Sequence, residues 1–493
     1  MKTNMNKILL PLALGALLLS SCANDFLSTD STEYLTKSDR DKKTKDTKIL
    51  EKFSSAALVA TYNVFGGSEG TSHDDFGLKA FHLATDIMCE DMLMTQRNWF
   101  IFDYEHGNNQ AQYRRTNSTW KMFYKAISDA NIILHDYYSE EKDDPDYKAL
   151  KSVPLAIRGI SFFHLVNFYQ HTYKGHEDLL GVPLQLEPSE KKYPRAKVSE
   201  VYKQIIADLT YAADNGAKTP SDRVDIDKFV AAAYLAKVYA QMEDWPNVAK
   251  YAAVAKEGAA DMVSEPGRSW EIGAADILWG HQITGVNTSL WASYPSHMDP
   301  LQLGYAGKNG AFKSIHNKLY QKIPATDSRR KLFLHDKDNK EIFAKYTALR
   351  PKLANYDQVK YSGTPAGMTG DYVYLRVQDP ILLEIEALNE TGETAKAATL
   401  LNEFVAKRNP NFAAPTEQNA LREEIRFQRR IELWGEGTNW FDMKRWKLMI
   451  NRNVEGTNHT VKVDIATDAP GFFHALPQSE LDANPLLEQN TIV

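Results

Sequence analysis

The sequence predicts a mainly α-helical fold, in which helix pairs form a scaffold that a large irregular segment interrupts. Apolar residues recur at helical spacing over much of the chain, the pattern of helices that bury one face. Two stretches repeat the order of helix, tight turn and helix. Residues 264–378, by contrast, are rich in Gly, Pro, Ser and Tyr and show little helical period.

The clearest single helix is predicted over residues 199–215. Tyr202, Ile205 and Leu209 fall on one face at i, i+3 and i+7 spacing. Ser199 is a suitable N-cap, because its hydroxyl can accept a hydrogen bond from a free backbone N–H of the first turn.

The two helix pairs are predicted over residues 227–258 and 379–409. The first turns at residues 243–246; in the second, Asp379 and Thr394 are the expected caps of the two helices. Each pair has roughly the 34-residue length of a tetratricopeptide-like repeat. Because the copies lie far apart in the sequence, the repeats are expected to be interrupted rather than tandem.

Two regions are predicted to be loop-rich. Residues 264–378 show a helical period only at 312–323, and residues 71–109 are loop-like at both ends. Long irregular segments in a compact protein are usually functional or disordered, and the apolar content of 264–378 favours function.

The N-terminus has the pattern of an export signal. A basic start precedes an apolar run over residues 8–19, which is too short to span a bilayer, since a span takes about 20 residues. Leu19-Ser20-Ser21-Cys22 resembles the lipobox of bacterial lipoproteins. This predicts a signal peptide over 1–21, a lipid on Cys22, a tether over 22–48 and a folded domain over 49–493.

An ordinary secretory signal is the alternative. Its cysteine, Cys22, would then pair with Cys89, the only other cysteine of the chain. If Cys22 carries the lipid, Cys89 is expected to be a buried lone thiol.

Charge excludes one class of partner. The chain has 58 basic and 64 acidic residues, a formal charge of -6, and removal of Lys2 and Lys7 with the signal peptide makes it about -8. Nucleic-acid binding needs a basic surface, so no nucleic-acid partner is expected.

Catalytic and metal motifs are weak. Residues 66–70 match G-x-S-x-G, but they follow a predicted helix instead of a strand, as a nucleophile elbow requires. His73, Asp74 and Asp75 are the nearest approach to a metal cluster, and a solvated loop is the favoured interpretation. No catalytic residue, metal or cofactor is therefore expected.

One carboxylate pair needs an explanation. Glu432 and Glu436 lie one helical turn apart and could suggest glycosidase chemistry. Ion pairing between packed helices is favoured, with three nearby arginines as partners: Arg429, Arg430 and Arg445. Arg158 and Asn131, in apolar helical contexts, are likewise predicted to be buried hydrogen-bonding groups.

Several segments together resemble one family. They are, in order, "ALVATYNVFGG", "TWKMFYKAISDANIIL", "AIRGISFFHLVNFYQ", "IRFQRRIELWGEGTNWFDMKRWK" and "LPQSELDANPLLEQN". Through these segments the chain resembles the SusD/RagB family of outer-membrane nutrient-uptake lipoproteins of the Bacteroidota. Two departures stand out: Asn439 replaces a usual arginine, and residues 168–184 form a longer link than usual.

The resemblance implies a lipid-anchored receptor that is not an enzyme. Such a protein lies in the outer membrane, exposed at the cell surface, and binds an oligosaccharide. It delivers this ligand to a SusC-like TonB-dependent transporter. The alternatives are a peptide receptor of the same type, a scaffold that binds nothing tightly, and a lipid-anchored glycoside hydrolase.

Ligand contacts are expected from rings and polar groups on the two loop-rich regions, because exposed rings offer flat faces to sugars. Phe100 belongs to an apolar run and is a weaker candidate. The expected residues are Asp75, Asn98, Trp99, Tyr104, Trp291, Tyr294, Tyr305 and Asn309.

Overall fold

The computed structural model describes residues 46–70, 72–219, 223–261 and 270–490. The chain divides into two compact units, Met1–Ser54 and Ser55–Val493, and the architecture below is that of the second. Helix α3 (Thr47–Gly66) crosses the boundary between them. The predicted signal peptide, Cys22 and nearly all of the predicted tether lie outside the described residues, so they stay predictions.

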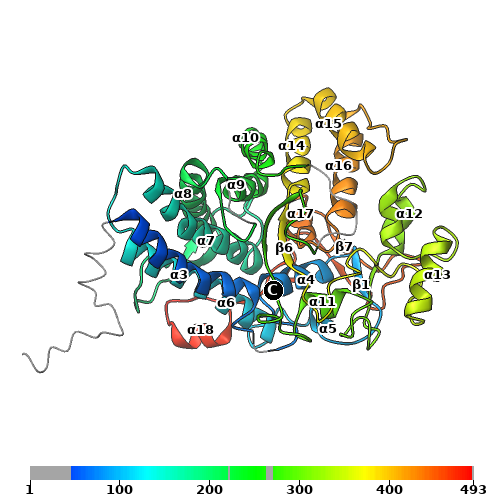
Figure 1. Ribbon diagram of the computed structural model, residues 1–493, viewed down its shortest axis with the longest axis horizontal. Helices are drawn as coiled ribbons and strands as arrows, with labels where there is room; N and C mark the ends of the chain where they lie inside the picture. Colours follow the sequence, from blue (N-terminus) through cyan, green and yellow to red (C-terminus); the bar gives the residue numbers. More distant parts are fainter. Residues whose placement is uncertain (1–45, 71, 220–222, 262–269, 491–493) are drawn as a thin grey trace, which may run out of the picture. The chain divides into compact units, whose positions relative to one another are not determined.

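Helices dominate this unit, and the long helices from α6 onward pack on one another in succession (Figure 1). The contacts run from α6 through α7, α8, α9 and α10 to α14, which also packs on α15 and α16. The mainly α-helical scaffold is therefore confirmed. These helices are α6 (Arg114–Tyr137), α7 (Pro145–Tyr169), α8 (Val198–Asn215), α9 (Lys228–Met242), α10 (Trp245–Lys256), α14 (Gln378–Glu390), α15 (Thr394–Ala406) and α16 (Gln418–Glu432).

The two predicted helix pairs, α9–α10 and α14–α15, are neighbours. Helix α10 packs directly on α14, although the loop-rich segment separates them in the chain (Figure 1). Small buried side chains, among them Ala232, Ala236 and Ala397, allow the helices to approach closely. The interrupted repeats are thus continuous in space.

The predicted helix caps are wrong in detail. Helix α8 begins directly after a strand, so Lys197 is its N-cap and Ser199 lies in the first turn. Asp379 lies inside α14, where its carboxylate contacts Lys237 and Arg429 at 3.0 and 2.8 Å. Helix α15 begins after Glu393, and the hydroxyl of Thr394 is not its cap.

Helices α6, α7 and α8 are joined by one buried arginine. Arg158 of α7 donates to both carboxylate oxygens of Asp208 on α8, at 2.8 and 2.7 Å. It also donates to the side-chain oxygen of Asn131 on α6 at 3.0 Å. The predicted role of Arg158 and Asn131 as buried hydrogen-bonding groups is confirmed.

Among the described helices, α7 is long and apolar enough to cross a membrane. Most of its apolar stretch is buried inside the protein, as in the core helix of a globular domain.

The described strands are short and pair two by two, all antiparallel. Strand β1 joins β5, β2 joins β3, β4 joins β6 and β7 joins β8. They form no wide sheet within the described residues. The strands are β1 (Met92–Met94), β2 (Leu180–Pro183), β3 (Arg195–Lys197), β4 (Ile277–His281), β5 (Lys313–Ile315), β6 (Tyr372–Arg376), β7 (Ile450–Asn451) and β8 (Asp464–Ile465).

The remaining elements are short and lie mostly in the loop-rich regions. The helix predicted over residues 312–323 is half wrong, because its first half pairs as strand β5 and only its second half is helical. The elements are α4 (Leu78–Met88), α5 (Ile101–Tyr104), α11 (Tyr294–Met298), α12 (Asn317–Lys322), α13 (Lys340–Leu349), α17 (Asn439–Arg445) and α18 (Gln478–Ala483), with 3₁₀ turns at Ser328–Leu332 and Pro470–Phe472.

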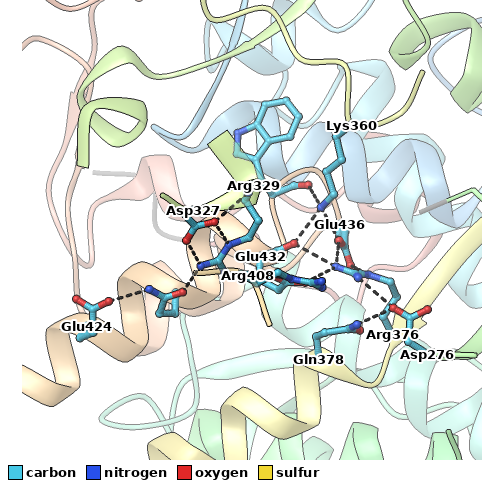
Figure 2. Close-up of polar contacts among 12 residues, drawn as sticks. Asp276, Asp327, Arg329, Lys360, Arg376, Gln378, Arg408, Glu424, Glu432 and Glu436 are labelled. Atoms are coloured by element: carbon cyan, nitrogen blue, oxygen red, sulfur yellow. Dashed lines mark hydrogen bonds and ion pairs between the residues drawn. The ribbon is translucent and has the colours of Figure 1, made fainter. Parts of the chain in front are cut away.

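A network of buried charges fixes the end of α16 to the loop-rich segment (Figure 2). Glu432 accepts hydrogen bonds from Arg329 and Arg408 at 3.2 and 2.9 Å. Arg376 of β6 lies 3.5 Å from the same carboxylate. Glu432 therefore compensates cations from three separate segments.

Glu436 is engaged in the same way. It accepts from Lys360 and from Arg376, both at 2.6 Å. The predicted ion pairing of Glu432 and Glu436 is confirmed, but the predicted partners are wrong. Those three arginines pair elsewhere: Arg429 with Asp379 and Asp442, Arg430 with Glu90 and Asp91, and Arg445 with Glu386 and Asp442.

Two further sequence features have structural explanations. Cys89 is buried and free, as expected of a lone thiol, and burial raises its pKa. Asn439 donates to Asp91 at 3.0 Å, and Arg430 provides this carboxylate with its cation.

Candidate functional site

Four half-buried rings from two distant parts of the chain meet in one place. We call His73, Trp99, Trp291 and Tyr305 the ring cluster. The rings of Trp291 and Tyr305 pack edge to face, with centroids 4.9 Å apart. Trp99 lies 6.3 Å from Tyr305 and stacks on His73 at 5.4 Å. A hydrogen bond of 2.6 Å joins the His73 ring to the Tyr305 hydroxyl.

A buried layer holds the ring cluster from below. His297 stacks under Tyr305 with centroids 4.8 Å apart, and its ring N–H donates to the backbone carbonyl of His73 at 2.7 Å. Phe76 and Phe100 pack on the same imidazole. Burial lowers the pKa of His297 to about 3, so this ring is neutral at physiological pH.

Strand pairing explains why the two regions meet. The Cα partners of the β1–β5 ladder are Met92 with Ile315, Leu93 with Ser314, and Met94 with Lys313. The ladder places the segment that carries Trp99 beside the segment that carries Tyr305. Phe100, just after Trp99, adopts a left-handed backbone conformation with φ of 71° and turns the chain into α5.

Two cations lie over the tryptophans. The guanidinium of Arg114 is 5.2 Å from the centroid of Trp99, and the ammonium of Lys308 is 5.4 Å from that of Trp291. Arg114 also donates to Asp74 at 2.8 Å. Burial raises the pKa of Asp74, but Arg115 and Arg114 outweigh it and hold the pKa below its usual value, so this carboxylate is ionised.

A cavity of about 780 Å³ adjoins the ring cluster through Arg114, which lines the cavity and lies over the ring of Trp99. This volume lies within the range of small-molecule sites. The cavity is bounded by the outer face of α6, by residues 183–193, by α18 and by the loop before α4. Side chains that carry its polar groups include Asp75, Arg114, Asn117, Lys121, Tyr124, Gln185, Tyr193 and Glu480.

The structure brings four of the eight expected residues to this place. Trp99, Trp291 and Tyr305 form the ring cluster, and Asp75 lines the cavity. Asn98 and Asn309 are half-buried on the same two loops. The Asn98 side chain accepts from the backbone N–H of Trp99 at 2.8 Å, which fixes the start of its turn.

Tyr104 and Tyr294 are not on the surface, contrary to expectation. Tyr104 is fully buried, and its hydroxyl hydrogen-bonds to His459 at 2.8 Å. Tyr294 is 2% exposed and donates to the backbone carbonyl of Gly435 at 2.8 Å. Each belongs to a short helix, α5 or α11, whose inner side faces the core, so both are packing residues here.

Several residues of the site were not expected from the sequence. For His73 the sequence favours a solvated loop over a metal ligand, whereas in the structure its ring contacts Trp99 and Tyr305. The sequence does not single out Arg114 and Lys308, since basic residues are common and the tryptophans that they contact lie 15 and 17 residues away. Tyr124, one helical turn after Trp120, was readable as an aromatic pair on α6, and the rings lie 4.6 Å apart.

The fold is that of a helical-repeat protein, and the candidate site is a ring-lined surface beside a cavity. The comparisons define the family. Residues 33–240 match a model described as "Starch-binding associating with outer membrane", and residues 330–492 match that of the SusD family. The chain belongs to the SusD/RagB family.

Relatives and solved structures agree with this assignment. SusD-like protein P2 of Formosa agariphila is 26% identical over 67% of this chain and 71% of its own length. SusD-like protein P25 of the same organism is 23% identical over 76% of this chain and 79% of its own. A SusD-like carbohydrate binding protein of Bacteroides vulgatus superposes with a TM-score of 0.76 at 20% identity, covering 89% of this chain and 97% of that one. A second SusD superfamily protein of this organism gives 0.77 at 20% identity, over 90% and 98%.

Proposed function

We propose that this protein binds an oligosaccharide at the ring cluster and the adjoining cavity. The observation that carries the proposal is the meeting of Trp99, Trp291 and Tyr305, which come from loops about 200 residues apart in sequence. All three rings are half-buried, so each is held by the protein while part of its surface faces solvent.

The physical basis is the match between rings and sugars. A pyranose has apolar C–H faces that pack on aromatic rings, while its hydroxyls need hydrogen-bonding partners. The ring cluster offers the first kind of surface. The cavity, with amide, carboxylate, hydroxyl and basic groups along α6 and residues 183–193, offers the second.

The buried carboxylates support binding rather than hydrolysis. A glycosidase needs two carboxyl groups about 5 to 10 Å apart on either side of a bound sugar. Glu432 and Glu436 are instead buried and neutralised by Arg329, Arg376 and Lys360. Of the carboxylates beside the ring cluster, Asp74 pairs with Arg114, while Asp75 and Glu480 line the adjoining cavity.

Delivery completes the proposal. As a SusD/RagB family member, the protein would pass its ligand to a SusC-like TonB-dependent transporter of the outer membrane. Cys22 would carry the lipid that anchors it at the cell surface. The matched description, "Starch-binding associating with outer membrane", supports both the site of action and the choice of α-glucans as first probes.

The experiment is calorimetric titration of the purified mature chain with a panel of oligosaccharides that begins with maltooligosaccharides, with chromatography of each mixture after incubation. We expect saturable binding to one glycan class and no new products. Release of shorter sugars would support a hydrolase instead. Saturation only by peptides in a parallel panel would assign the peptide-receptor alternative.

Trp291→Ala tests the site itself. Loss of the Trp291 ring should weaken oligosaccharide binding by about tenfold or more, which corresponds to about 1.4 kcal/mol of binding free energy. The matched control is Phe102→Ala, since Phe102 lies three residues after Trp99, in α5, and is 50% exposed but does not belong to the ring cluster. A control variant that lost as much affinity as Trp291→Ala would contradict the assignment.

A further inference from the structure

Two histidines and one aspartate meet on the side of the molecule formed by the long link after α7 and the loop after β8. His171 and His176 belong to the link, and Asp468 lies in the second loop. Their ligand atoms all lie within 4.8 Å of one another. The imidazoles stack with centroids 4.7 Å apart, and Nε2 of His176 is 3.5 Å from the Asp468 carboxylate.

The hydrogen bonding of His176 prepares it to bind a metal. Its Nδ1 lies 3.0 Å from the backbone carbonyl of Thr172, which can only accept, so this nitrogen carries the proton. The lone pair is therefore on Nε2, the atom that faces Asp468. Metal-ligating histidines typically donate their second ring N–H to a carbonyl or carboxylate in this way, which fixes tautomer and ring orientation.

His171 is held by its surroundings. Phe473 packs edge to face on the His171 ring, with centroids 4.8 Å apart. The backbone N–H of His171 donates to the side-chain oxygen of Gln170 at 2.9 Å. His171 and Asp468 also border a small cavity of about 10 Å³. Lys444 lines this cavity too, but its ammonium donates to the backbone carbonyls of Asn167 and Gln170 at 2.5 and 2.6 Å.

The chemistry of the three groups selects a class of metal. Two imidazoles and one carboxylate suit Zn²⁺ and related transition metals, whereas Ca²⁺ and Mg²⁺ prefer sets of oxygen atoms. Bonds of about 2.1 Å in a tetrahedral site place ligand atoms roughly 3.4 Å apart. The His176–Asp468 pair already has this separation, and the exposed Asp468 can turn to complete the site. The His-x₄-His spacing also falls within the range of zinc sites.

We propose that His171, His176 and Asp468 form a site for a divalent transition metal, with Zn²⁺ as the probe. The three ligands leave a fourth tetrahedral position for water. The metal would cross-link the long link between α7 and β2 to the segment that follows β8. The metal would thereby hold in place the long link that the sequence shows at residues 168–184.

The test uses the mature chain without a histidine tag, freed of metal by EDTA and then dialysed. Titration with ZnCl₂ should show one site per chain, and Zn²⁺ should raise the unfolding temperature. Loss of an outer-shell partner alone costs about 10–100-fold in metal affinity, so His176→Gln should weaken binding by at least about 100-fold. Asp468→Asn is the second variant; Asn tolerates the left-handed conformation of this residue, whose φ is 61°.

His135→Gln is the matched control. His135 also lies beside a carboxylate, Asp136, at 3.0 Å, but it belongs to no such group of three in the described part of the chain. Unchanged Zn²⁺ binding in this variant, with loss in His176→Gln and Asp468→Asn at unchanged circular dichroism, supports the site. Absence of stoichiometric binding to the wild type, undiminished affinity in both variants, or equal affinity for Ca²⁺ would overturn it.

Discussion

Glu432 illustrates how a single residue organises this protein. Burial raises the pKa of its carboxyl, but Arg408, Arg329 and Arg376 outweigh burial and hold the pKa well below its usual range. The carboxylate therefore stays ionised among three buried cations. Its partners lie 24 to 103 residues away in sequence, so they were not predictable from the motif in which Glu432 lies.

Substituting Glu432 by Ala should therefore destabilise the fold. Breaking a buried ion pair by removing one partner costs about 3–5 kcal/mol, because charges remain buried without compensation. Urea unfolding measures the change. Glu423→Ala on the same helix is the control: this side chain is 68% exposed and pairs with Arg426, so the expected change is below about 0.5 kcal/mol. Equal stability of the two variants would contradict a structural role for Glu432.

The ring-bearing residues show what the sequence can and cannot predict at this scale. Composition and loop context pointed to the segments that contain Trp99, Trp291 and Tyr305, and the structure brings these three rings together. They did not distinguish these from Tyr104 and Tyr294, which have the same chemistry but lie on the inner side of short helices. Exposure depends on tertiary packing, so it could not be predicted from residue type.

At the scale of elements, the long helices were predictable and the short ones were not. Periodic apolar residues identified α8, α9, α10, α14 and α15, because helices that bury one face must repeat every 3.6 residues. Strands of two to five residues, such as β1 and β5, carry too few residues for a period to appear. Their pairing spans more than 200 residues and yet positions the ring cluster.

A glycine sets the junction between two elements near the site. Gly77 precedes α4 with φ of 73°, and a Cβ there would lie 2.1 Å from the backbone oxygen of Phe65 in α3. The end of α3 and the start of α4 thus approach more closely than any side chain allows. This junction supports the loop that carries His73 and Asp75.

We expect Gly77→Ala to lower the free energy of unfolding by at least about 3 kcal/mol, since both the backbone conformation and a backbone contact must change. Gly392→Ala separates the two causes. Gly392 has φ of 87° in the turn between α14 and α15, with open space where a Cβ would lie. Only conformational strain of about 1–2 kcal/mol is expected there. Chemical unfolding of both variants measures the two losses of stability. An equal loss of stability would show that the contact with Phe65 is unimportant.

At the scale of the whole molecule, the proposed lipid anchor would determine where the proposed binding site works. Acyl chains contribute about 0.8 kcal/mol per buried CH₂, so several chains on Cys22 would hold the protein firmly in a membrane. A Cys22→Ala variant, expressed in a strain that lacks the proposed partner transporter, should leave the outer-membrane fraction. Retention of the variant with the membranes at the wild-type level would argue against the lipid anchor.

The helical scaffold and the family followed from the sequence, because they depend on local periods and motifs. The cavity did not. It is bounded by α6, residues 183–193 and α18, which meet only when the chain has folded. The same is true of the group formed by His171, His176 and Asp468, because the aspartate lies almost 300 residues from the two histidines.

The central claim is that the ring cluster binds a glycan. Titration of wild type, Trp291→Ala and Phe102→Ala with one binding oligosaccharide tests it most directly. We predict saturable binding in the wild type, at least about tenfold weaker binding in Trp291→Ala, and unchanged binding in Phe102→Ala. Wild-type affinity in the Trp291→Ala variant would contradict the claim and place the ligand elsewhere.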